Sequence, residues 1–183
     1  MILMLQQSYM LSSKIKVAGE DDKPDFVEMH PRFYSNYSRF SLSALRKASF
    51  QEFLFWMLSS ENIEEQSVSS VYIQVYPVAT KSGLNIVGRC DTFRGRIRIY
   101  PKSFYFCNAL RKKLGKEVLF AFVGNRARAA LIHELLHLKY ASDEKKVREL
   151  TDLYFCAYLK KKQFNKNSAL LRALIFSTKK PAF

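Results

Sequence analysis

The stretch from Ala127 to Tyr140, ARAALIHELLHLKY, contains two histidines four residues apart with a glutamate between them. No proline or glycine occurs from Asn125 to Tyr140, and most of these residues favour helix, so the stretch predicts a helix that begins near Gly124 and Asn125. Residues four apart lie on one face of a helix, about one turn from each other. Apolar residues surround the histidines on several sides, which indicates a helix that crosses the core of a domain.

His133, Glu134 and His137 form the pattern His-Glu-x-x-His. Two imidazoles on one helix face can bind a single Zn²⁺ while the glutamate activates a water molecule. The chain has only 3 histidines, so the pairing of two of them around a glutamate favours a metal site over a chance match. The motif predicts a zinc-dependent peptidase in which His133 and His137 bind the metal and Glu134 is the general base.

Two histidines leave a tetrahedral catalytic zinc one protein ligand short. No histidine follows His137, so the third ligand must be a carboxylate, a cysteine or the distant His30. His30 precedes Pro31, and a residue in that position is better explained as part of a turn.

The residues after the motif predict a second helix, which Asp143 and Glu144 open and which ends near Lys162. Its apolar residues occupy almost the whole circumference, so we expect it to be largely buried. An acid on such a helix is costly unless it is paired or binds a metal. We therefore expect Glu149 as the third zinc ligand and Asp152 as the group that orients a ligand histidine.

Other roles for these acids stay open at the level of the sequence. Glu144 and Asp152 are alternative candidates for the third ligand. Ion pairs of the acids with Lys145 or Arg148 would explain them without a metal.

A helix with His-Glu-Leu-Leu-His, a short turn and a second helix with Glu149-x-x-Asp152 resembles the gluzincin clan of zinc metallopeptidases. Within that clan the chain is most similar to the small archaeal minigluzincins, over roughly residues 70 to 160. The resemblance implies a zincin-like fold, peptide hydrolysis, and zinc held by His133, His137 and a glutamate on the following helix. The chain departs from the larger members because Glu149 follows His137 by only twelve residues.

Two other functions remain as alternatives. SprT-like proteases, which often act on DNA, share the motif, but their third ligand is a downstream histidine, and this chain has none after His137. A basic nucleic-acid-binding protein with a non-catalytic zinc site is the second alternative. It is suggested by the net charge of +14, from 30 basic and 16 acidic residues, which attracts nucleic acid or other anionic partners.

Length and composition indicate one globular domain. The chain has 183 residues, of which 48% are hydrophobic, enough for a sizeable core. The odd number of cysteines, 3, favours free thiols in a reducing compartment. Neither a signal peptide nor an apolar run of membrane-spanning length is recognisable, so we expect a cytoplasmic protein without membrane contact.

The region before the motif predicts a helix and a small sheet. Residues 1–40 are irregular and are expected to form an N-terminal extension, followed by a zincin-like domain over residues 41–183. A helix is expected from Ser41 or Ser43 to Leu58, then strands at 71–76, 84–89 and 93–100, then a helical segment at 104–123 interrupted at Gly115. The last strand carries arginines on one face and is expected near a sheet edge, where substrate could pair. The fold class is therefore α+β, with a small, mostly antiparallel sheet.

Overall fold

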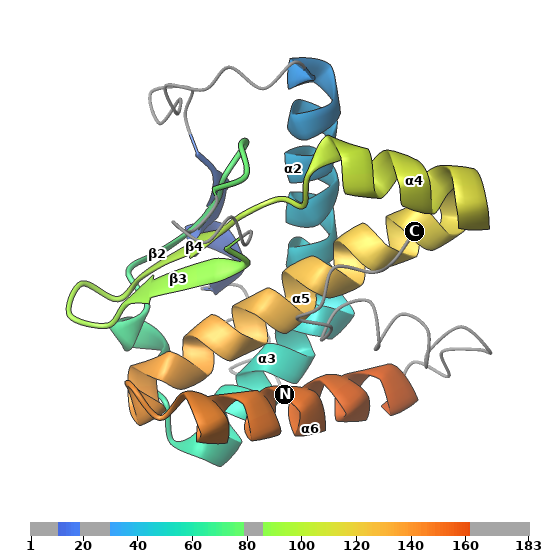
Figure 1. Cartoon of the computed structure of the whole chain (residues 1–183). Helices are drawn as coiled ribbons and strands as arrows, with labels where there is room; N and C mark the ends of the chain where they lie inside the picture. The colour runs from blue at the N-terminus through green and yellow to red at the C-terminus, as the bar shows by residue number, and fades with distance from the viewer. Residues whose placement is uncertain (1–10, 19–29, 79–85, 162–183) are drawn as a thin grey trace.

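The structure, a computed structural model, describes residues 11–18, 30–78 and 86–161, and its fold is α+β as expected (Figure 1). The longer helices are α2 (Pro31–Arg46), α3 (Ala48–Glu61), α4 (Phe104–Leu114), α5 (Lys116–Tyr140) and α6 (Glu144–Lys161). The strands are β1 (Ile15–Val17), β2 (Ser70–Ile73), β3 (Gly88–Asp91) and β4 (Arg96–Ile99). None of the described helices combines the length and the apolar composition that a membrane-spanning segment requires.

The described strands form a mixed four-stranded sheet in the order β1-β2-β4-β3. β1 pairs with β2 and β2 with β4 in parallel, and only β3 and β4 are antiparallel. The expectation of a mostly antiparallel sheet was therefore wrong. The chain leaves β2, reaches the far edge of the sheet as β3 and returns through a hairpin, so that β4 enters beside β2 in the same direction.

The arginine-bearing strand does not lie at the edge of the sheet. β4 is hydrogen bonded to β2 on one side and to β3 on the other, whereas β3 has a described neighbour on one side only. The alternation of Ile97 and Ile99 with arginines reflects a strand with one buried and one wet face, which is compatible with a central strand. The expectation that residues 93–100 lie near a sheet edge was therefore wrong.

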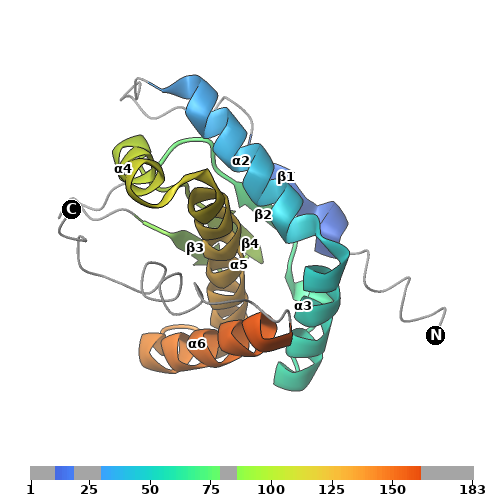
Figure 2. The ribbon, with the colours of Figure 1, turned by 90° about the vertical axis from the view of Figure 1, so that its right-hand side faces the viewer.

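The helices pack on one face of the sheet. Side chains on that face, such as Val71, Ile73, Ile97 and Ile99, are buried, and they share a core with apolar residues of α3, α5 and α6. Viewed from the side of the helices, α5 and α2 lie in front of the sheet (Figure 2). This arrangement leaves one polar sheet face and brings β3 and β4 against the motif helix.

The expected N-terminal extension contributes to the folded layers where the structure describes it. Residues 15–17 form β1, and residues 31–40 belong to α2, which Pro31 opens in the first helical turn. The single helix expected from residue 41 or 43 to Leu58 is two helices, because Lys47 adopts an extended backbone with φ −60° and ψ 126°. The C-terminal part of the expected domain, 162–183, lies outside the described residues.

The motif helix is longer than expected. The interruption at Gly115 is confirmed, since α4 ends before it and α5 begins after it. The boundary expected at Gly124 and Asn125 was wrong, because both residues are buried inside α5. A side chain at Gly124 would approach Ala44 Cβ to 3.3 Å, so this glycine permits the close crossing of α5 and α2 rather than a helix start.

The second helix has the expected bounds but is more exposed to solvent than expected. α6 runs from Glu144 to Lys161, and Val147, Tyr154 and Phe155 are buried against the core. Glu149 and Leu153 are exposed, the latter to 62%. The expectation of a helix buried on nearly all sides was wrong because, within the described part of the chain, α6 packs against its neighbours with one face.

Candidate metal centre

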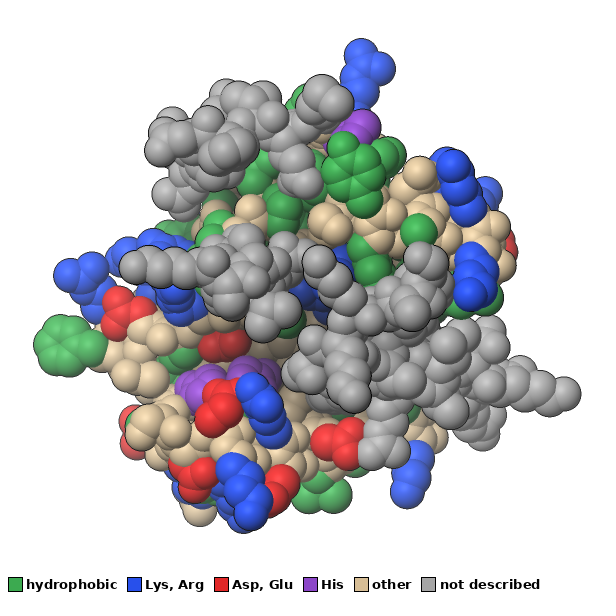
Figure 3. Space-filling model, in the orientation of Figure 1, with side chains coloured by type: hydrophobic (Ala, Val, Ile, Leu, Met, Phe, Trp, Pro, Cys, Tyr) green, Lys and Arg blue, Asp and Glu red, His purple; other side chains and the backbone are tan. Residues whose placement is uncertain are grey.

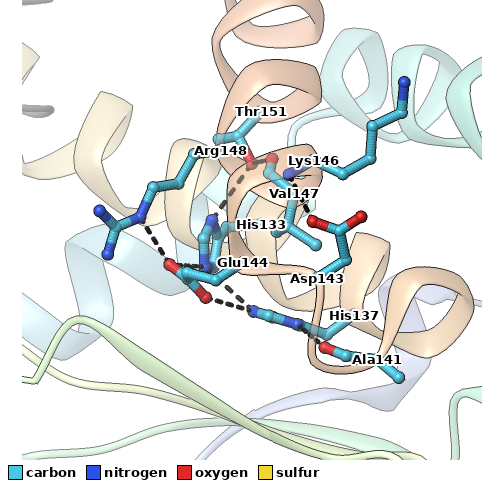
Figure 4. Close-up of polar contacts among 9 residues, drawn as sticks. All are labelled: His133, His137, Ala141, Asp143, Glu144, Lys146, Val147, Arg148 and Thr151. Atoms are coloured by element: carbon cyan, nitrogen blue, oxygen red, sulfur yellow. Dashed lines mark hydrogen bonds and ion pairs between the residues drawn. The ribbon is translucent and has the colours of Figure 1, made fainter.

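α5 and α6 bring two histidines and one carboxylate together near the turn that joins the helices (Figure 4). The Nε2 atoms of His133 and His137 are 3.2 Å apart. Glu144, the first residue of α6, places one carboxylate oxygen 3.7 Å from His133 Nε2 and the other 3.4 Å from His137 Nε2. These ligand atoms all lie within 4.8 Å of one another.

The other nitrogen of each imidazole is held by a protein acceptor. His137 Nδ1 lies 2.6 Å from the Ala141 carbonyl oxygen, which can only accept, so this nitrogen carries the proton. His133 Nδ1 lies 3.2 Å from Thr151 Oγ1. The Thr151 hydroxyl donates its hydrogen to the Val147 carbonyl at 2.7 Å, so it accepts from His133. Both imidazoles therefore present an Nε2 lone pair to the centre of the cluster.

This convergence of acceptors fits a cation. Two lone pairs and a carboxylate facing one another repel unless positive charge lies between them. Tetrahedral zinc with ligand bonds of about 2.0–2.2 Å separates its ligand atoms by roughly 3.3–3.6 Å. The observed separations of 3.2, 3.4 and 3.7 Å are close to that range. The site also keeps access to solvent, since the side chains of His133, His137 and Glu144 are 23%, 16% and 47% exposed (Figure 3).

The local sequence explains why Glu144 arrives at the histidines. α5 ends at Tyr140, and Ala141 takes a positive φ of 44° that turns its carbonyl toward His137. The Asp143 carboxylate accepts a hydrogen bond from the Lys146 backbone N–H at 3.0 Å and so caps α6. Arg148, one turn into α6, holds the Glu144 carboxylate at 2.6 Å.

The electrostatics keep His133 neutral. Its pKa is lowered to about 4, chiefly by burial and also by the charges of His137 and Arg148, although Glu144 opposes the shift. A neutral imidazole is the form that binds a metal.

Glu134 is next to His133 in the sequence, and its side chain lies against β3 at the edge of the described sheet. Its side chain is buried, with only 5% of the residue exposed. A Cβ atom at position 88 on β3 would collide with the Glu134 carboxylate in its present position, so Gly88 lets β3 pass close to this side chain. Burial and the charge of Glu144 raise the pKa of Glu134 to about 8, although Arg89 opposes the shift. A cation in the cluster would lower this pKa, because positive charge stabilises the carboxylate.

The residues expected at the site are not all brought together. His133, His137 and Glu134 are adjacent, but the carboxylate at the histidines belongs to Glu144, which the sequence offered as an alternative to Glu149. Glu149 is exposed, and five residues of helix turn it about 140° away from Glu144. At His133, Thr151 makes the orienting contact expected of Asp152, whose carboxylate lies 3.7 Å from the Cys156 sulfur.

Three further residues of the site region were missed from the sequence. Thr151 lies seven residues after Glu144, two helical turns along one face, and that spacing could have identified it. Gly88 gave no signal, because its role depends on the approach of β3 to α5. Glu61 at the end of α3 accepts hydrogen bonds from Tyr140, at 2.7 Å, and from Tyr154, and so connects the ends of α3 and α5 with α6.

His30 lies away from the cluster. Its ring stacks on Phe104 with 3.5 Å between the ring centroids, at the start of α2. This position agrees with its interpretation as a turn residue.

Comparison of the chain with protein-family models, with curated proteins and with solved structures finds no match.

Proposed function

We propose that the protein is a zinc metallopeptidase that hydrolyses peptide bonds, with zinc held by His133, His137 and Glu144. The observation that carries the proposal is the convergence of two imidazole lone pairs and a carboxylate, each imidazole fixed through its Nδ1–H. When bound, zinc supplies Lewis-acid chemistry, because it acidifies water and polarises a carbonyl group.

Glu134 is the general base in this proposal. It follows His133 directly and its carboxylate lies between the histidines' helix and β3, where a water molecule and a substrate carbonyl could meet it. The carboxylate takes a proton from the attacking water and delivers it to the leaving amine. The raised pKa of Glu134 suits this exchange, because a base with a pKa near neutral pH can also act as an acid.

β3 is the proposed rim for the substrate. Among the described strands it is the antiparallel strand at the edge, it packs against α5, and Gly88 brings its backbone to Glu134. An extended peptide that adds to such an edge gains main-chain hydrogen bonds without a demand on its sequence. This assignment replaces the rim first expected on residues 93–100.

The proposed ligand set still resembles that of the gluzincins, but with a different glutamate. The third ligand remains a glutamate on the helix after the motif, but Glu144 follows His137 by seven residues rather than the twelve of Glu149. The ligand sits in the first turn of α6, where the N-terminal helix dipole favours negative charge.

Zinc content and peptide cleavage, measured on the same preparations, test the proposal. The wild type is expected to hold one zinc and to cleave a casein substrate. Glu134→Gln should keep the zinc and lose cleavage by several orders of magnitude, whereas His137→Ala should lose both. Equal zinc in wild type and His137→Ala would refute the metal site, and undiminished cleavage by Glu134→Gln would refute the mechanism.

A further inference from the structure

The polar face of the sheet, which points away from the helices, carries a row of cationic side chains around one tyrosine. The strand register pairs Lys16 with Tyr72, Tyr72 with Arg98, and Arg98 with Arg89. Directly paired residues project from the same side of a sheet, so these four side chains cross all four strands in one line. Arg96 projects from the same face, two residues before Arg98 on β4. These five residues are called the basic sheet face below.

The positive charge of the basic sheet face is poorly compensated within the described part of the chain. Arg89 and Arg98 lie directly opposite each other, an arrangement that destabilises a sheet. None of the three arginines forms an ion pair with a described carboxylate, and the Nε of Arg96 is buried without a hydrogen-bond partner. Asp91 lies directly opposite Arg96 and is the one carboxylate that the described strands bring to this face, but it forms no ion pair with that arginine, and its carboxylate accepts a hydrogen bond from the backbone N–H of Arg94 at 3.0 Å. An anionic partner would remove this repulsion.

Two aromatic side chains lie next to the cationic side chains of this face. Tyr72 is half-buried between Lys16 and Arg98, so its ring is held in place by its neighbours. At the tip of the β3–β4 hairpin Phe93 is 96% exposed, beside Arg94. Basic side chains gather over this end of the sheet at the left of Figure 3. Cations that follow a backbone, combined with aromatic rings on which bases stack, are the two components of single-strand recognition.

We propose that the basic sheet face binds single-stranded nucleic acid, with Lys16, Arg96 and Arg98 on phosphates and Tyr72 under a base. An anionic membrane is the competing partner, but the row consists of charged side chains and one tyrosine, with little apolar area to enter an acyl layer. Most of the face lies apart from the metal centre, because Lys16, Tyr72 and Arg98 project from the opposite side of the sheet to Gly88 and Cys90, which project toward α5. Arg89, at the edge, is the exception, since its charge also acts on Glu134. The inference therefore does not depend on zinc or on peptidase activity.

The charge component is tested by fluorescence anisotropy with labelled oligo(dT) and oligo(rU) of about 12 nucleotides. The variant Arg96→Gln/Arg98→Gln should bind at least about tenfold more weakly at 0.1 M salt, with a salt slope reduced by about 1 to 1.4. The control Lys112→Gln/Lys116→Gln removes the same charge from exposed positions on α4 and α5 and should change affinity by less than about twofold. Equal loss in both double variants would overturn the proposal, because binding would then follow net charge alone.

The role of the Tyr72 ring is tested separately, so that the proposal stays testable if the arginine double variant does not fold. Tyr72→Ala should weaken oligonucleotide binding by roughly 5- to 150-fold, whereas Tyr72→Phe, which keeps the ring, should stay within about twofold of wild type. Thermal unfolding checks that each variant folds. Equal affinity of Tyr72→Ala and Tyr72→Phe, tighter binding to the matching duplex, or binding to vesicles with phosphatidylserine but not to oligonucleotides would each overturn the proposal.

Discussion

At the scale of single residues, the choice between two glutamates on α6 decides which carboxylate completes the proposed metal centre. Glu144 reaches both histidines in the structure, and Glu149 is exposed on another side of the helix. Both residues are acidic and both lie in the first half of α6, so each serves as the control for the other.

Glu144→Ala is expected to lower zinc affinity by at least about 100-fold, because the cluster loses the carboxylate that the described residues bring to it. Glu149→Ala should keep the affinity of wild type within about threefold. Competition with a zinc chelator of known affinity measures both. The reverse result would return the ligand to Glu149, where the sequence first suggested it.

Glu134 should make the zinc-free protein less stable as pH rises. Its pKa is raised from 4.5 to about 8 in the folded state, so between these values the folded state binds a proton that the unfolded state has lost. Stability therefore falls as pH rises through this window. Glu134→Gln removes the effect, and its advantage in unfolding free energy over wild type should grow by as much as about 4 kcal/mol from pH 5 to pH 8. Denaturant unfolding with EDTA present measures it, and a constant difference would contradict the raised pKa.

At the scale of elements, the position of Glu144 depends on how α6 is held against α5. Glu61, at the end of α3, is buried and accepts hydrogen bonds from Tyr140 and Lys139 of α5 and from Tyr154 of α6. Burial favours the protonated form of Glu61, but these hydrogen bonds outweigh it and lower its pKa. Glu61 and its three hydrogen-bond partners, called the Glu61 cluster, therefore connect α5 and α6 to α3.

Tyr154→Phe removes the hydrogen bond from α6 to Glu61 and should weaken the attachment of α6 to α3. The loss of one buried hydrogen bond to a charged acceptor is expected to cost about 1.5–3 kcal/mol of stability and to weaken zinc binding severalfold. Tyr105→Phe, at a side chain 65% exposed, is the matched control and should change neither quantity. Urea unfolding and zinc titration check the pair, and unchanged zinc affinity in a destabilised Tyr154→Phe would limit the cluster to a structural role.

At the scale of the whole molecule, zinc would join the histidines of α5 to the first residue of α6 and so stabilise the folded chain. A ligand that binds only the folded state at 1,000 times its dissociation constant contributes about 4 kcal/mol. For a chain of this length, that corresponds to a rise in Tm of roughly 10 °C. Calorimetry with zinc and with EDTA should show this difference in wild type and not in His137→Ala. An equal rise in both proteins would indicate zinc binding elsewhere.

Several features followed from the sequence because they depend on local spacing. The pattern His133-Glu134-x-x-His137 sets its histidines on one helix face wherever that helix lies. Gly115 and Asp143 mark a helix break and a helix start through their own backbone and capping preferences. The α+β class followed equally from the apolar periodicity of the segments.

Tertiary structure alone decided the features that depend on contacts between distant segments. Glu144 rather than Glu149 meets the histidines because the Ala141 turn and the packing of α6 fix which side of that helix faces α5. β3 rather than β4 is the edge strand, because β2 pairs with β4 across a long crossover that local periodicity does not specify. Gly88 and Glu61 acquire their roles only where β3 and α3 reach the site helices, so no local pattern could reveal them.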